Sequence, residues 1–135
     1  MVVLVHANSG GGGGGGGASA PDVTPYRGTA TTVPPNALTT VVSRVVPGGF
    51  AFKVHGILVS GNAPAEWALF DNGTEVLRSR TSPTDRGKDL LEGRANALSF
   101  AAGRTVELKV EHTETDRVSG STSRNFQATI LGRDA

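Results

Sequence analysis

Hydrophobic and polar residues alternate along several short segments from residue 38 onward. The clearest case is 104–112, where Val106, Leu108 and Val110 fall on one side and polar or charged residues lie between them. A period of two is typical of a strand that is buried on one face. The pattern predicts seven strands, at 38–46, 50–59, 65–70, 75–81, 97–101, 104–112 and 125–131.

The segments between these strands carry turn residues. Asn72-Gly73 accepts the positive φ angles of a type I′ turn, so it predicts a two-residue hairpin. No helical period is found, and residues 82–95 are a polar loop. We therefore expect an all-β, antiparallel, jelly-roll-like sandwich over residues 38–135. Phe50 and Leu58 are placed on its inner face, and its core is predicted to contain Phe52, Val54, Trp67, Leu69, Val106, Leu108, Val110, Phe126 and Ile130.

Residues 1–37 are predicted to form an extended Gly/Pro-rich arm. It begins with an apolar tip, continues through the eight glycines of 10–17, and contains several prolines in 18–37. Polyglycine predicts a flexible tether with a reach of about 16 Å. The tip would bind a partner by adding a strand to a sheet edge or by filling a groove, and Tyr26 would pin the arm to a surface; the alternative is a disordered end. The tip residues are Val2, Val3, Leu4 and Val5.

Composition and motifs argue against catalysis, metal binding and binding of nucleic acid. The net charge is +1, and the chain has no cysteine, so we expect no nucleic-acid or membrane partner and no thiolate metal site. His6, His55 and His112 are isolated in sequence, and the two on strands are expected to be solvated. No nucleophile motif is found, and the glycine run lacks the lysine of a phosphate-binding loop. We predict no enzyme activity and no cofactor.

Four arginines are the most prominent polar feature, and two interpretations remain open. They either coat a solvated sheet face, or they form an interface with acidic groups of another copy, such as Glu92, Glu111, Glu114 or Asp116. Trp67 likewise has two possible roles, in the core or as a platform for a sugar ring. The arginines are Arg78, Arg80, Arg86 and Arg94.

Several segments together resemble small β-sandwich virion proteins of tailed bacteriophages. They are Val-Pro-Gly-Gly-Phe at 46–50, the stretch 59–66, Asp-Asn-Gly-Thr at 71–74, and the stretches 80–86 and 125–132. The resemblance covers about residues 41–132 and leaves out the glycine-rich arm. It implies a non-enzymatic structural subunit of a capsid decoration, a neck or collar, or a tail.

The resemblance also implies which partners the protein has and where it is found. The partners would be other virion proteins, the chain would form a symmetric homo-oligomer, and the virion would be assembled in the host cytoplasm. The alternative function is a carbohydrate-binding module for attachment to a host surface or a tail. Exposed tryptophan or tyrosine on a concave face would favour that alternative, and Trp67 is its main candidate.

Overall fold

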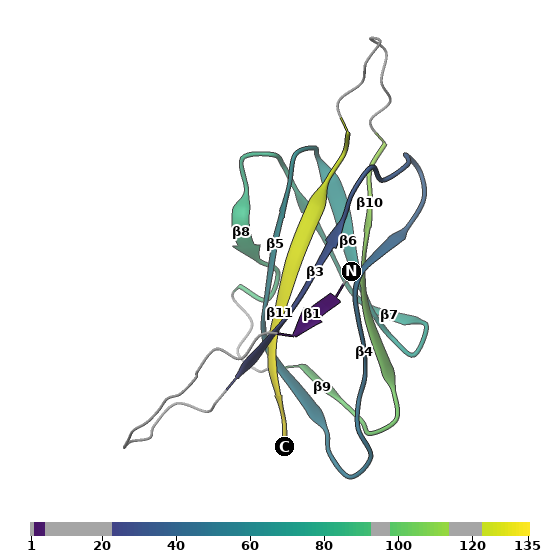
Figure 1. Ribbon diagram of the computed structural model, residues 1–135, viewed down its shortest axis with the longest axis vertical. Helices are drawn as coiled ribbons and strands as arrows, with labels where there is room; N and C mark the ends of the chain where they lie inside the picture. Colours follow the sequence, from purple (N-terminus) through teal and green to yellow (C-terminus); the bar gives the residue numbers. More distant parts are fainter. Residues whose placement is uncertain (1, 5–22, 93–97, 114–122) are drawn as a thin grey trace, which may run out of the picture.

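The computed structural model describes residues 2–4, 23–92, 98–113 and 123–135, and these residues form strands and no helix (Figure 1). The ten strands within these ranges are β1 (Val2–Leu4), β3 (Thr24–Ala30), β4 (Thr39–Val45), β5 (Phe52–Gly61), β6 (Ala65–Asp71), β7 (Thr74–Thr81), β8 (Arg86–Asp89), β9 (Leu98–Phe100), β10 (Thr105–Glu111) and β11 (Phe126–Asp134).

The strands form two antiparallel sheets. A six-stranded sheet has the order β1-β3-β11-β5-β8, and β9 also pairs with β5, beyond the stretch that pairs with β8. A four-stranded sheet has the order β4-β10-β6-β7. The prediction of an all-β chain is confirmed, and the two sheets are consistent with a β-sandwich.

The predicted core lies between these sheets. All nine predicted core residues have at most 2% of their surface exposed. They come from both sheets, because alternate residues of β5, β6, β10 and β11 point inward. Trp67 is fully buried, packs edge-to-face on Phe126, and donates a hydrogen bond from Nε1 to Thr81 Oγ1 at 2.9 Å. The indole is therefore satisfied inside the core.

Each of the seven predicted strands is present, but β1, β3 and β8 were not among them. β8 lies in the predicted loop 82–95. β3 lies in the range predicted to be an arm, yet it pairs with β11 along seven residues. Residues 24–30 therefore belong to the six-stranded sheet. Pro25 is tolerated there because it is only the second residue of its strand.

The inner face predicted for β5 was wrong in part. Val54 lies opposite Gly132 and Gly56 lies opposite Leu131, so His55 is an extra residue without a partner in the ladder. One extra residue reverses the alternation that follows it. Ile57 and Val59 consequently point inward, while Leu58 moves to the outer face. Phe50 precedes the strand and is 49% exposed.

The hairpin prediction at Asn72-Gly73 is confirmed. Asp71 pairs with Thr74, and the two central residues have φ angles of 53° and 88°. The turn connects β6 to β7 in the four-stranded sheet. Two positive φ angles in sequence are what a type I′ turn requires.

Candidate interaction surfaces

The N-terminal strand β1 lies at an edge of the six-stranded sheet. It pairs antiparallel with β3, and the register places Val2 opposite Gly28, Val3 opposite Arg27 and Leu4 opposite Tyr26. Three of the four predicted tip residues thus form a strand on an edge of their own chain's sheet. Val5 and the tether 10–17 lie outside the described residues, and binding of the tip to another subunit stays a prediction.

Beneath this edge, Tyr26 packs against the core rather than standing exposed. Its ring meets Phe52 edge-to-face at a centroid distance of 5.3 Å, and the Arg44 guanidinium lies 4.5 Å from its centroid. Burial raises the pKa of the Tyr26 hydroxyl, with Arg44 opposing this rise. Tyr26 therefore fixes β3 on the sandwich, and it does not offer the flat exposed platform of a sugar-binding tyrosine.

Arg44 connects the two sheets at this point. It belongs to β4 of the four-stranded sheet and forms a bidentate ion pair with Asp134 of β11, with N–O distances of 2.7 and 2.8 Å. The hydrogen bonds from Arg44 hold the pKa of Asp134 below its usual range. Sequence reasoning missed this pair, because no local pattern relates residues so far apart in the chain.

β3 also approaches β4 closely. A side chain on Gly28 would collide with the backbone carbonyl of Val41, so only glycine fits at this position. The neighbouring inward positions are Tyr26 and Ala30, and the outward ones are Arg27 and Thr29. This alternation of inner and outer residues is the signal by which the strand could have been recognised in the sequence.

Two of the predicted arginines form ion pairs on the outer face of the four-stranded sheet. Arg78 contacts Glu66 at 2.7 Å and Glu75 at 2.8 Å, and Arg80 contacts Glu66 at 2.9 Å. The hydrogen bonds from Arg78 lower the pKa of both glutamates. Within the chain, this surface matches the sheet-face interpretation; its use between copies stays a prediction.

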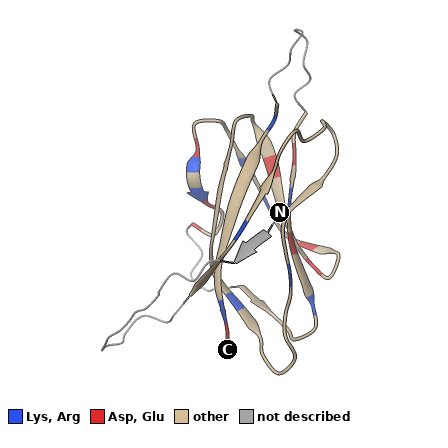
Figure 2. Ribbon diagram, viewed as in Figure 1, with Lys and Arg blue, Asp and Glu red and all other residues tan. Residues whose placement is uncertain are grey.

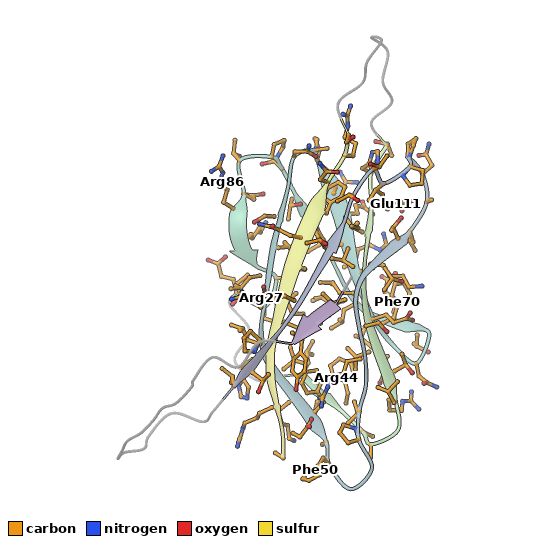
Figure 3. All side chains as sticks on the ribbon, viewed as in Figure 1. Arg27, Arg44, Phe50, Phe70, Arg86 and Glu111 are labelled. Atoms are coloured by element: carbon orange, nitrogen blue, oxygen red, sulfur yellow. The ribbon has the colours of Figure 1, made fainter. Side chains whose placement is uncertain are left out.

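The third arginine, Arg86, lies on a different surface. It begins β8 at the edge of the six-stranded sheet, where basic residues are marked on the ribbon in Figure 2. Figure 3 shows Arg86 and Arg27 on the opposite side of the molecule from Phe70 and Glu111 of the four-stranded sheet. The predicted group is therefore divided between two faces. Arg94, Glu114 and Asp116 lie outside the described residues.

The histidine expectation holds for one strand residue and fails for the other. His55 is exposed, as expected. His112 is only 2% exposed, because it continues the inward series of Val106, Leu108 and Val110. Its Nε2 donates a hydrogen bond to the carbonyl oxygen of Val33 at 2.7 Å, and its ring lies near Phe126. His6 lies outside the described residues.

The described ranges contain no group of three or more histidine, cysteine or acidic side chains that could hold a metal ion. Nor do they contain a helix long and apolar enough to cross a membrane. No protein-family model matches the chain, and no curated protein matches it in sequence.

Proposed function

We propose that this protein is a non-enzymatic structural subunit of a bacteriophage virion, with a jelly-roll-like sandwich that binds other virion proteins and further copies of itself. The observation that carries the proposal is the pairing of β1 with the edge of β3. It supports the idea that the apolar N-terminal tip attaches by adding a strand to a sheet. The turn and strand pattern of residues 41–132 supports the choice of a virion protein.

The connection between these two strands favours attachment in trans. Antiparallel neighbours can be joined by about two residues, whereas residues 5–23 separate β1 from β3 and include the glycine run. This length of sequence allows the tip to reach beyond its own sheet. The same backbone hydrogen bonds are available on the β3 edge of a neighbouring copy, which the tether can reach.

In an assembled particle, binding of the tip to a neighbouring copy would be favoured over its pairing with its own sheet. The tip contributes only three paired residues, and each backbone hydrogen bond adds about 0.5–1.5 kcal/mol net. Such a contact is weak between separate molecules in dilute solution. Symmetric packing places many copies side by side, so the effective concentration of each tip near a second edge becomes high.

Deletion of residues 1–17 tests the proposal. The truncated chain should keep its sheet signal in circular dichroism but enter the assembly less well. The measurement is sedimentation of full-length and truncated protein, side by side, each alone and mixed with the virion proteins encoded by neighbouring genes. A matched control replaces the glycines of 10–17 with alternating Gly and Ser, which keeps both the tip and its reach. Equal assembly of the truncated and full-length proteins would disprove anchoring by the tip.

Proline substitutions separate strand addition from the filling of a groove. Val3→Pro and Leu4→Pro should be made separately, because alternate residues of a strand point their N–H groups toward the partner. One of the two must remove a donor that faces β3, and it should weaken assembly more than the other. Equal assembly of both variants with the full-length chain would show that the tip binds through its side chains instead.

A further inference from the structure

The outer face of the six-stranded sheet is hollowed toward the end where β3 and β5 finish and β11 begins. Two adjoining hollows, of about 710 and 340 Å³, share Thr29, Ser60 and Gln127 in their walls. They extend across β3, β11, β5 and β8 and form one open trough. Its remaining polar walls include Thr31, Asn62, Asn125 and Thr129. The function proposed above does not use this trough.

The strand register explains how the trough is built. Thr29, Gln127, Ser60 and Arg86 lie opposite one another on four successive strands and form one row across the sheet. Arg27, Thr129, Leu58 and Asp89 form the adjacent row, in which the Asp89 carboxylate already accepts hydrogen bonds from the backbone N–H groups of Ile57 and Leu91. Leu58 reaches this face only because of the extra residue at His55. The first row crosses three strand spacings and is about 14–15 Å long, a length that suits an extended oligomeric ligand.

The trough carries positive charge without a carboxylate in its walls. Its lining includes Arg27 and Arg86 but no aspartate or glutamate. Neither arginine has an ion-pair partner among the described residues, in contrast with Arg78 on the other sheet. An exposed guanidinium offers two parallel N–H donors that match a carboxylate. The face is therefore complementary to an anionic ligand.

The neutral side chains identify the kind of anion. Asn62, Asn125 and Ser60 already bond to backbone groups of the protein. The hydroxyls of Thr31 and Thr129 and the carboxamide of Gln127 both donate and accept hydrogen bonds, as do the hydroxyl groups of sugars. An extended acidic peptide would instead bind along a strand edge through its backbone. Two arginines are too few for the many phosphate contacts of nucleic acid. We infer that this trough binds an oligosaccharide that carries carboxylate groups.

The binding mode would depend on hydrogen bonds and charge rather than on stacking. Phe126 is the aromatic residue in the described lining, and it is buried beneath the face. Affinity should therefore be moderate and should fall with added salt. The inference is independent of the proposed virion role, because it uses neither β1 nor the tether that follows it.

Calorimetric titration of the full-length protein with an oligogalacturonate tests this inference. Binding is expected for the oligogalacturonate and not for a malto-oligosaccharide of the same length, which lacks carboxylates. Arg27→Gln and Arg86→Gln should each weaken binding roughly three- to tenfold, as expected for the loss of one charge-assisted hydrogen-bonding group. Gln127→Leu should also weaken it, because the amide stands in the middle of the first row.

The control is Arg133→Gln, which removes an equal charge from β11 outside the trough. Its affinity should equal that of the unchanged protein. Thermal unfolding checks that each variant is folded. Arg27, Arg86 and Gln127 line the trough, whereas Arg133 does not. The inference would be overturned if Arg133→Gln lost as much affinity as the trough variants, or if poly-glutamate bound as tightly as the oligogalacturonate. Either result would mean that net charge alone explains binding.

Two other results would also overturn it. One is the absence of oligogalacturonate binding by the unchanged protein. The other is a change in the sedimentation of the saccharide-free protein when Arg27 and Arg86 are replaced, because the face would then be an interface between copies.

Discussion

The two sheets share one core but treat charge differently on their outer faces. On the four-stranded sheet, Arg78 and Arg80 are held by Glu66 and Glu75. On the six-stranded sheet, Arg27 and Arg86 flank a trough without carboxylates in its described lining. Arginines paired within the chain support the fold, whereas Arg27 and Arg86 have no ion-pair partner among the described residues. The proposed ligand binding would give the two faces separate roles.

The inner faces of the sheets, by contrast, should be equivalent. Leu108 of the four-stranded sheet and Ile130 of the six-stranded sheet are each at most 1% exposed. Replacing either by alanine should cost about 2–5 kcal/mol, because both leave a cavity in the core. Urea unfolding of the two variants measures these losses. A cost below about 1 kcal/mol for either residue would contradict its place in a packed core.

Gly28 tests whether β3 belongs to the sandwich. Gly28→Ala should destabilise the protein by about 1–3 kcal/mol, because the new Cβ would meet the Val41 backbone and force β3 away from β4. Gly56→Ala is the matched control on the same sheet, since its Cβ would meet the end of the Leu131 side chain at 3.3 Å. If both changes cost the same in urea unfolding, β3 is not closely packed on β4.

The four-stranded sheet was the easier one to predict from the sequence. β6 and β7 are adjacent in the chain and joined by the Asn72-Gly73 turn, so local signals specify their pairing. The alternation in β10 specifies which of its faces is buried.

The six-stranded sheet depends on partners that lie far apart in the chain. β3 pairs with β11 although most of the chain separates the two strands in sequence, and the proline and glycine of β3 resembled those of a linker. The extra residue in β5 leaves no mark in the sequence, yet it decides which side Leu58 faces. The trough could not be predicted either, because its rows join four strands whose register only the fold sets.

The Arg44–Asp134 pair, which joins the sheets, should make stability sensitive to acid. The folded-state pKa of Asp134 lies below its usual value, so the pair stabilises the fold fully above about pH 4, the unfolded pKa. This contribution is lost as the pH falls through the folded pKa. Asp134→Asn should lower the unfolding midpoint at pH 7, and its difference from the unchanged protein should shrink below pH 4. A difference that stays constant over this range would contradict a stabilising ion pair.

The smallest effect should distinguish the two outer faces directly. Arg78→Ala leaves Glu75 without its ion-pair partner and leaves Glu66 with Arg80 only, so the two glutamates repel each other more strongly. Arg86→Ala removes no ion pair within the described residues. Thermal unfolding at low salt should therefore show a small decrease in Tm for Arg78→Ala and none for Arg86→Ala. Because exposed ion pairs are screened, the decrease should fade at high salt. It should also fade below about pH 4, since both glutamates have lowered pKa values and lose their charge only in acid. Equal decreases for the two arginines would mean that the faces do not differ in how they hold charge, and the contrast between a supporting face and a binding face would be wrong.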